Sequence, residues 1–390
     1  MTEITNSPRS YVYLDHAATS PLRPEARDAM SKYGDVMYAN PSGSHRFARE
    51  ARQVIDEARD VVAEVIGCRP GEVIFTSGGT EGANAAVLGA TRRTGGTAVC
   101  GATEHHAVLH CVEHIGGTVV PVTSAGSVDP DVMRAVLTDL DDVAVVSVMA
   151  VNNETGAISD LEHISHAVRR QAPNAVFHTD AVQAACWIDL RTVWSYVDCL
   201  TLSAHKFGGP KGMGIMVLRE GATLEPLILG GGQERDRRSG THNVAGIVGT
   251  SVALSLTDQK RNSEVTRLGA LRNQLVDGIT SRIECATATL APGAGTAGTA
   301  HVCLENLESE SLLYLLDEAS VCVSAASACA SGAMEPSHVL AAMGVSRERI
   351  KGSLRFSLGH TTTENDVSAA INATIAAAAR LGAVTSCKFF

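Results

Sequence analysis

The sequence predicts an α/β fold in which a large, mostly parallel sheet is joined to a second, smaller lobe. Its 390 residues exceed the usual size of one domain. Hydrophobic residues make up 45% of the chain and aromatic residues only 4%, which favours closely packed α/β layers over an aromatic-rich β-sandwich. In the middle of the chain, short apolar stretches alternate with amphipathic ones, as expected for parallel strands joined by helices.

The alternation continues over most of the first two thirds of the chain. Amphipathic segments such as 46–66 and 161–170 have the spacing of helices that pack one apolar side on a sheet. In sheets of this kind ligands bind at the carboxyl ends of the strands, so polar motifs there are candidates for a site. The expected strands cover residues 72–76, 97–101, 143–149, 175–178, 199–202 and 214–217.

The pattern changes near residue 243, where a long helix with one apolar stripe is expected over residues 243–283. A second α/β set follows, with strands expected at 301–304, 320–324 and 353–358. We place the domain boundary inside the long helix and expect the N-terminus to pack with the second lobe. The predicted large domain covers residues 16–255, and the small domain covers residues 1–15 and 256–390.

The composition excludes several classes of protein. A net charge of −10, without a run of basic residues, gives the chain no general attraction to nucleic acid or to anionic membranes. No apolar stretch is long enough to cross a bilayer, and residues 1–10 lack the apolar core of a signal peptide. Ten cysteines without a C-x-x-C pair predict reduced thiols, and we expect a cytoplasmic protein.

A glycine-rich turn is expected where the first strand meets a helix, at Gly78-Gly79-Thr80. Glycines let backbone N–H groups approach a phosphate closely, and a helix N-terminus adds a favourable dipole and free donors. An ordinary strand-to-helix turn can have a similar sequence. This motif alone therefore does not decide between a phosphate site and a simple connection.

Two later strands are followed by a charged residue. Asp180 could keep a pyridinium nitrogen protonated, although an aspartate here could also cap a helix. Lys206 precedes a Gly/Pro-rich loop, although most lysines are solvated surface charges. Together with the glycine-rich turn they form the set that pyridoxal phosphate requires. Lys206 would form the Schiff base, Asp180 would hold the ring nitrogen, and residues 78–80 would hold the phosphate.

These segments resemble the class V aminotransferase family, and within it the cysteine desulfurases of the NifS/IscS type. The resemblance implies fold type I of the pyridoxal-phosphate-dependent transferases and conversion of L-cysteine to L-alanine. It covers nearly the whole chain, in the family's order. The motifs are Tyr13-Leu14-Asp15-His16-Ala17-Ala18-Thr19, Asn40-Pro41-Ser42, Thr103-Glu104-His105, Asn152-Asn153-Glu154-Thr155-Gly156, Arg238-Ser239-Gly240-Thr241 and Leu354-Arg355-Phe356-Ser357-Leu358-Gly359.

The resemblance also implies roles for individual residues. Lys206 and His105 would be catalytic, with His105 stacked on the cofactor ring. Asn153 and Arg355 would bind the substrate, and Arg355 suits its carboxylate because a guanidinium is a planar, two-pronged donor. Thr241 would reach the phosphate of a neighbouring subunit, so the active form would be a homodimer. The residues implied to contact the cofactor are Gly79, Thr80, His105, Asn153, Asp180, Gln183, Ser203, His205, Lys206 and Thr241.

The segment around Cys329 determines which reaction we expect. Every residue from 324 to 333 is small, so a flexible loop could carry the thiol to the cofactor and then to an acceptor. Alternatively, Cys329 could replace an alanine in a linker. The segment resembles the long cysteine loop of group I desulfurases, which implies that Cys329 carries the sulfur as a persulfide. Among the other cysteines, only Cys387 is expected outside strand and helix patterns.

Two other functions share parts of this pattern. Another class V enzyme, an aminotransferase or a selenocysteine lyase, would keep the cofactor residues without needing Cys329. A non-catalytic sulfur-relay subunit would lack Lys206 or Asp180, and both are present. The sulfur acceptor stays open among a cluster scaffold, a tRNA thiolation enzyme and a DNA phosphorothioation system. The segment after Arg380 is shorter than the tail that docks a scaffold in some relatives.

Three histidines, His106, His110 and His114, recur every four residues on a probable helix. This spacing could bind a metal ion. No acidic or cysteine ligand is evident beside them, so we expect a solvated helix face and no metal site.

Overall fold

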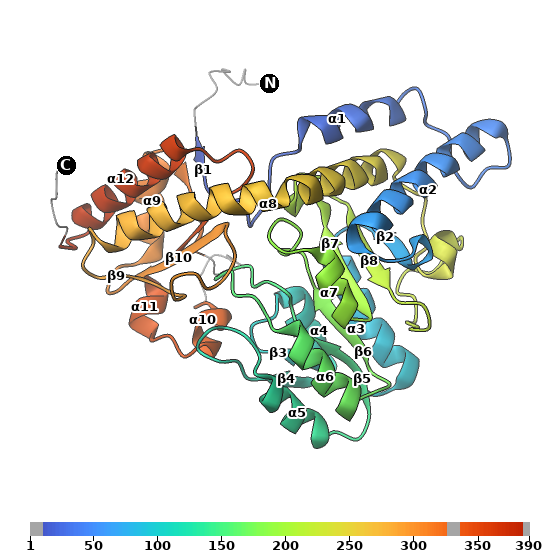
Figure 1. The fold of residues 1–390 in the computed structure, drawn as a ribbon, viewed down its shortest axis with the longest axis horizontal. Helices are drawn as coiled ribbons and strands as arrows, with labels where there is room; N and C mark the ends of the chain where they lie inside the picture. Colours follow the sequence, from blue (N-terminus) through green and yellow to red (C-terminus); the bar gives the residue numbers. More distant parts are fainter. Residues whose placement is uncertain (1–10, 326–335, 385–390) are drawn as a thin grey trace.

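The computed structural model describes residues 11–325 and 336–384, which form two lobes joined by one long helix (Figure 1). The first lobe contains a seven-stranded sheet of order β2-β8-β7-β6-β5-β3-β4. The strands from β7 to β4 are parallel, β8 is antiparallel to both of its neighbours, β7 and β2, and β2 forms the edge of the sheet. The strands are β2 (Val73–Thr76), β3 (Thr97–Gly101), β4 (Thr118–Val120), β5 (Val143–Ser147), β6 (Val176–Asp180), β7 (Cys199–Ser203) and β8 (Gly214–Leu218).

Helices cover both faces of this sheet because successive side chains of each strand point to opposite faces. On β2, Ile74 packs with the helices of one face and Phe75 with those of the other. The first face is covered by α3 (Gly79–Thr94) and α4 (His106–His114). The second face is covered by α2 (Arg46–Ile66), α5 (Pro130–Thr138), α6 (Leu161–Gln171) and α7 (Leu190–Tyr196).

The second lobe contains an antiparallel sheet of order β12-β10-β9 and a parallel pair of β1 and β11. The pairing of β1 with β11 places the chain from residue 12 against the second lobe. The strands are β1 (Val12–Tyr13), β9 (Ala286–Ala288), β10 (Thr299–Leu304), β11 (Val321–Cys322) and β12 (Ser353–Ser357). The helices are α9 (Ser309–Glu318), α10 (His338–Ala342), α11 (Arg347–Lys351) and α12 (Glu364–Arg380).

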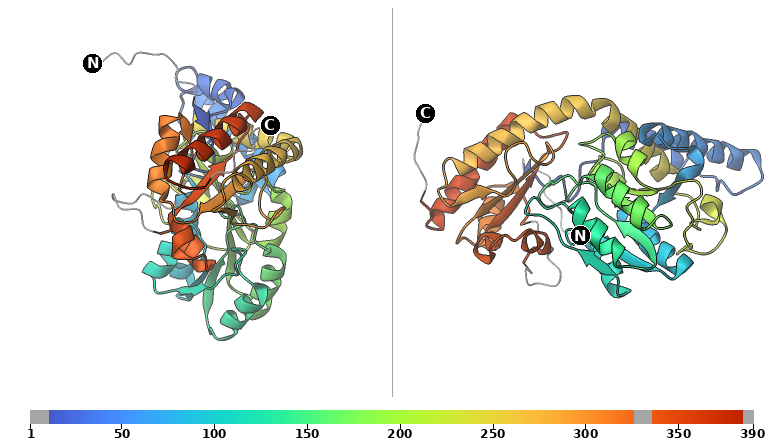
Figure 2. Two further views of the ribbon diagram at one scale, coloured as in Figure 1. Left: turned by 90° about the vertical axis from the view of Figure 1, so that its left-hand side faces the viewer. Right: turned by 60° about the horizontal axis from the view of Figure 1, so that its bottom comes forward.

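Helix α8 (Val244–Thr280) connects the lobes and runs along both of them, as the right-hand view of Figure 2 shows. It also packs against α1 (Pro24–Met30). Ala253 and Leu254 belong to the core of the first lobe, whereas Leu268 and Leu275 belong to the core of the second. The predicted domain boundary at residue 255 stays a prediction.

The predicted α/β fold with a mostly parallel sheet is confirmed. The long helix expected over residues 243–283 is α8, and the other predicted strands agree with the structure to within a few residues. The prediction missed β1, β4 and β9, which have only two or three residues and show no clear apolar alternation. Among the described residues, no helix is both long and apolar enough to cross a membrane.

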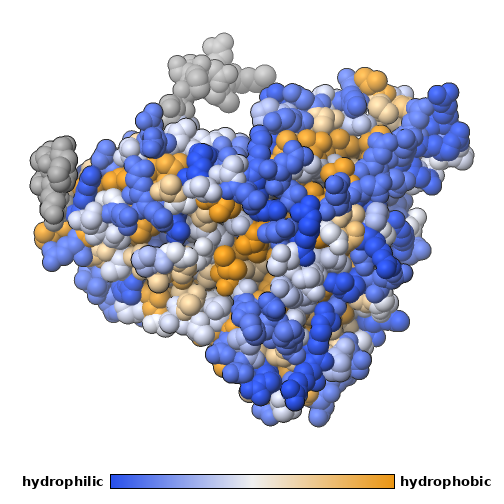
Figure 3. Space-filling view, in the orientation of Figure 1, coloured by the Kyte–Doolittle hydropathy of each residue, from blue (hydrophilic) through white to orange (hydrophobic). Residues whose placement is uncertain are grey.

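The surface is largely hydrophilic on the face shown in Figure 3, with apolar surface visible between the two lobes. Several large apolar side chains are nevertheless exposed elsewhere in the first lobe. Tyr38 is 71% exposed, and Leu229 is 80% exposed. Val36 is also exposed near Tyr38, and Ile228 is exposed next to Leu229, so each of these side chains belongs to a short exposed apolar segment.

Candidate active site

Ten of the residues predicted for the site line one cleft, with a volume of about 840 Å³. That volume includes space open to solvent, as expected of a cleft that admits a small molecule. Nine of these residues come from the first lobe, and Arg355 comes from β12 of the second. The ten are Gly79, Thr80, His105, Asn153, Asp180, Gln183, Ser203, His205, Lys206 and Arg355.

The cleft forms where parallel strands end. Asp180 is the last residue of β6, and Ser203 is the last residue of the neighbouring parallel strand β7. A single 3₁₀ turn, Ala204–Lys206, then carries Lys206 to the same edge of the sheet. His105 reaches this edge as the N-cap of α4, where its Nδ1 accepts a hydrogen bond from the Ala107 N–H at 3.1 Å.

The amine of Lys206 is held by backbone carbonyls of the N-terminal segment. Its Nζ donates to the carbonyl oxygens of Ala17 at 2.6 Å and Ala18 at 2.9 Å. Desolvation lowers the pKa of Lys206 to about 8, and the positive charge of Arg355 contributes to that shift. At neutral pH a useful fraction of the amine is therefore unprotonated, as a nucleophile or base must be.

Asp180 and His105 lie in the same cleft and influence each other's protonation. Desolvation raises the pKa of Asp180, and the nearby His105 opposes that shift. Desolvation also lowers the pKa of His105, which Asp180 opposes. Beside them, burial raises the pKa of Glu104 well above its usual value, while its Oε1 accepts a hydrogen bond from the Met149 N–H. A positive group placed against Asp180 would offset its burial.

The first turn of α3 has the features of an anion site. At Gly79 an added Cβ would lie 2.6 Å from Cγ2 of Val182, so glycine permits the close approach of these segments. The sixteen-residue helix α3 begins at this residue. Thr80, Ser203 and His205 line the same cleft as Gly79. A helix N-terminus with nearby hydroxyl and imidazole groups fits a phosphate.

Arg355 enters the cleft from the second lobe. Its Nη1 donates to the Asn153 carbonyl at 2.9 Å, and its Nη2 donates to Asp15 Oδ1 at 2.8 Å. The side chain is buried, and its Nε has no partner among the described residues. These contacts fix the guanidinium plane and leave donors free for a carboxylate.

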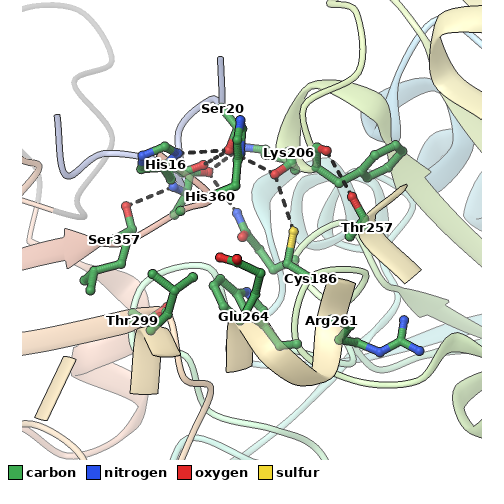
Figure 4. A pocket seen from close by; sticks show the side chains of 18 of the residues that line it. His16, Ser20, Cys186, Lys206, Thr257, Arg261, Glu264, Thr299, Ser357 and His360 are labelled. Carbon is green, nitrogen blue, oxygen red and sulfur yellow. Dashed lines mark hydrogen bonds between the residues drawn. The ribbon is translucent and has the colours of Figure 1, made fainter. Parts of the chain in front are cut away.

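A second hollow, of about 620 Å³, lies behind Lys206 between the lobes (Figure 4). From this side Ser20 Oγ donates to the Lys206 carbonyl at 3.1 Å, and the Cys186 thiol lies 3.8 Å from the same oxygen. Thr257 Oγ1 donates to the Phe207 carbonyl at 3.2 Å. These hydrogen bonds fix the backbone of Lys206 and Phe207, and so the position from which the Lys206 side chain extends.

Of the predicted site residues that the structure describes, Thr241 lies outside the cleft. Thr241 is exposed, and Cys329 lies outside the described residues. After that segment the chain resumes at Pro336, and Ser337 Oγ donates to the buried carboxylate of Glu154. Burial raises the pKa of Glu154 to about 7. Glu154 lies next to Asn153, so this contact joins the end of the cysteine segment to the cleft.

Sequence reasoning missed several partners of the site residues. The carbonyls of Ala17 and Ala18 leave no side-chain signal. The motif that contains them could have indicated Asp15, because an acid beside apolar residues requires a partner.

The expectation that, apart from Cys329, only Cys387 lies outside strands and helices was wrong. Cys68, Cys186 and Cys285 lie in turns or bends.

The predicted histidine row lies on α4 as expected. His106 stacks on His110 with ring centroids 4.6 Å apart, and its other neighbour is His338, also at 4.6 Å. His338 Nε2 lies 3.0 Å from the Glu104 carbonyl oxygen. In the part of the chain that the structure describes, no three His, Cys, Asp or Glu side chains are arranged to hold a metal ion.

Comparison with known proteins is consistent with this geometry. The model of the family described as aminotransferase class-V matches residues 12–370. This chain belongs to the class V aminotransferase family. A "Cysteine desulfurase IscS" from Dictyoglomus turgidum is 41% identical over 364 residues, with 91% of each chain covered. An "IscS-like cysteine desulfurase" from Mycobacterium tuberculosis is 42% identical over 386 residues, covering 94% of this chain and 96% of the relative.

Solved structures show the same fold. A structure named NifS-like protein has a TM-score of 0.87 and 32% identity, and the match covers 95% of this chain and all of that one. A structure described as SspA in complex with cysteine has a TM-score of 0.73 and 28% identity, covering 89% and 98%. The resemblance inferred from the motifs is thereby confirmed, and the chain is an enzyme of this family.

Proposed function

We propose that this chain is a pyridoxal-phosphate-dependent cysteine desulfurase that converts L-cysteine to L-alanine and transfers the sulfur to Cys329. The observation that carries the proposal is the single cleft shared by Lys206, Asp180, the first turn of α3 and Arg355. Relatives named cysteine desulfurase, alike over more than nine tenths of the chain, support the same reaction.

The residues of the cleft fit the cofactor. Lys206 would hold it covalently, Asp180 would pair with its ring nitrogen, and the start of α3 would hold its phosphate. Gln183 and Asn153 would contact the ring, although the amide nitrogen of Gln183 donates to the Ala17 carbonyl at 2.8 Å in this structure. Bound pyridoxal phosphate would supply an electron sink for the charge left when the substrate loses its α-proton.

The chain's own groups would position the substrate and move its protons. Arg355, held by Asp15 and Asn153, would bind the substrate carboxylate with its remaining N–H donors. The Lys206 amine, with its pKa lowered to about 8, would take the α-proton at Nζ once it is free of the cofactor. Ala17 and Ala18 would then stabilise the ammonium with the carbonyls that bind it in this structure.

The sulfur step rests on the sequence around Cys329. The Cys329 thiolate would form a bond to the substrate sulfur as the Cβ–S bond breaks, leaving a persulfide on the enzyme. A proton added to the carbon that lost the sulfur would then complete the methyl group of alanine, which is released. A cysteine of ordinary pKa is mostly protonated near neutral pH, so a base such as His105 would assist.

We further propose that the active form is a homodimer. Thr241 is exposed outside its own cleft, in the segment that follows the exposed residues Ile228 and Leu229. Arg238 in the same segment forms an ion pair with Glu81 at 2.8 Å, which holds the segment beside the first turn of α3. A two-fold dimer would bury these apolar side chains and bring Thr241 to the partner's phosphate. Sedimentation should show a dimer at micromolar concentration, and a fully active monomer would contradict this.

We propose that the sulfur acceptor is a protein of a cluster-assembly or thiolation system and that the transfer takes place in a reducing cytoplasm.

The desulfurase reaction is tested with purified protein. It should be yellow, and with L-cysteine and a reductant it should release alanine and sulfide in equal amounts. Alanine without sulfide, or activity confined to selenocysteine, would instead indicate one of the other class V reactions.

A further inference from the structure

A third hollow lies beside the cleft, mainly in the second lobe, and its volume of about 680 Å³ includes space open to solvent. One wall is a face of α8 that carries Arg272, Val276 and Asp277. The opposite wall is the loop 289–298 between β9 and β10, including Leu290 and Pro292. The hollow therefore combines apolar side chains with one cationic and one anionic side chain from the same helix.

The two charges lie in different surroundings: the Arg272 side chain is half-buried, and the Asp277 carboxylate is exposed to solvent at the rim of the hollow. Among the described residues, neither the Arg272 guanidinium nor the Asp277 carboxylate forms a hydrogen bond or an ion pair, and Arg272 Nε is a buried atom without a partner. The charge of Asp277 acts on Arg272, although the two side chains do not form an ion pair. Unpaired opposite charges beside apolar walls have the chemistry of a site for a zwitterion.

A buried imidazole completes the lining. His301, on β10, is only 4% exposed, and its Nε2 has no partner in the described part of the chain. Its Nδ1 lies 2.6 Å from Thr289 Oγ1, which fixes the ring. His301 stands opposite Arg355 in the β10–β12 pairing, and Thr155 of the turn beside Asn153 also lines the hollow. The hollow thus adjoins the cleft without sharing its charged residues.

We propose that this hollow binds a free α-amino acid with an aliphatic side chain. Arg272 would take the carboxylate, Asp277 would take the ammonium group, and Val276, Leu290 and Pro292 would pack against the side chain. The balance of one positive and one negative charge disfavours phosphates and dicarboxylates. This site is separate from the substrate position in the cleft and does not depend on the proposed desulfurase reaction.

The test is a calorimetric titration of the purified holoenzyme with L-leucine after borohydride reduction. Reduction fixes the cofactor to Lys206, so the cleft cannot capture an amino acid, and loss of the yellow colour verifies it. If the protein were colourless from the start, the proposed function would fail, but binding at the hollow could still be measured. We expect one leucine per chain. 4-Methylpentanoate, which lacks the ammonium, and L-leucinamide, which lacks the carboxylate, should each bind about tenfold or more weakly.

Two variants assign the site. Arg272→Gln and Asp277→Asn should each weaken leucine binding by about tenfold or more, whereas Lys260→Gln, an exposed charge change on the same helix, should leave it unchanged. Arg355→Gln, in the cleft, should also leave it unchanged. Absence of binding to the reduced protein, or binding that survives both Arg272→Gln and Asp277→Asn, would overturn the proposal. Equal binding of 4-methylpentanoate and leucine would do the same.

Discussion

The two lobes contribute to the cleft in different ways. The first lobe supplies nine residues at strand ends and helix starts of one packed sheet, so their backbone positions are set by the core. The second lobe supplies Arg355 from a short antiparallel sheet, and Cys329 belongs to this half of the sequence. Under the proposed function, the first lobe would hold the cofactor, and the second would supply the residues that select the substrate and receive the sulfur.

The largest expected effect lies in the first lobe. Lys206→Ala removes the cofactor attachment and the base, so alanine formation should fall by at least about a hundredfold and the yellow colour should disappear. Lys211→Ala, an exposed lysine in the adjoining loop, is the matched control and should keep both. Turnover is measured as alanine released from L-cysteine. Normal turnover by Lys206→Ala would show that the first lobe does not hold the cofactor as described.

A smaller effect is expected where the second lobe meets the substrate. Arg355→Lys keeps the charge but loses the two-pronged geometry, at a cost of about 1.5–3 kcal/mol, or roughly ten- to hundredfold in KM for cysteine. The colour should remain, because the cofactor residues belong to the other lobe. Steady-state kinetics measures this, with Arg347→Lys as an exposed control. An unchanged KM would remove Arg355 from substrate binding.

The last effect concerns stability, not turnover, and lies at the junction between the lobes. The pKa of Glu154 is raised from 4.5 to about 7 in the folded protein, so its stabilising protonated state is complete below about pH 4.5 and is lost as the pH rises through 7. Glu154→Gln stays neutral and can still accept from Ser337. Its free energy of unfolding should be close to wild type near pH 5 and higher by about 3 kcal/mol at pH 8. Denaturant titrations at both pH values measure this, and an equal difference at both would contradict it.

The same contrast explains what could be predicted from the sequence. Strands buried along their whole length begin with apolar residues, as β5 and β6 do, and the polar residue that ends each strand marks the carboxyl edge of the sheet. Asp180 and Lys206 could therefore be placed beside one another from sequence. The short edge strand β4 and the two-residue strand β1 could not, because their pairing depends on distant segments.

Contacts that join distant segments were also beyond the sequence. The amine of Lys206 is held by main-chain carbonyls of Ala17 and Ala18, which any residue type could provide. The hollow beside Arg272 and Asp277 on α8 depends on the β9–β10 loop, which is distant from them in the sequence. Periodicity identifies which helix face is buried, but it does not identify which charges find partners.

In the proposed reaction, sulfur leaves the substrate and becomes attached to Cys329. The most direct measurement is mass spectrometry of peptides after the protein is briefly exposed to L-cysteine without a reductant. The Cys329 peptide should gain the mass of one sulfur atom, and Cys329→Ser should keep its colour but lose sulfide release, while Cys387→Ser behaves like wild type. Sulfur found on Cys387 instead, or undiminished sulfide release from Cys329→Ser, would contradict the claim.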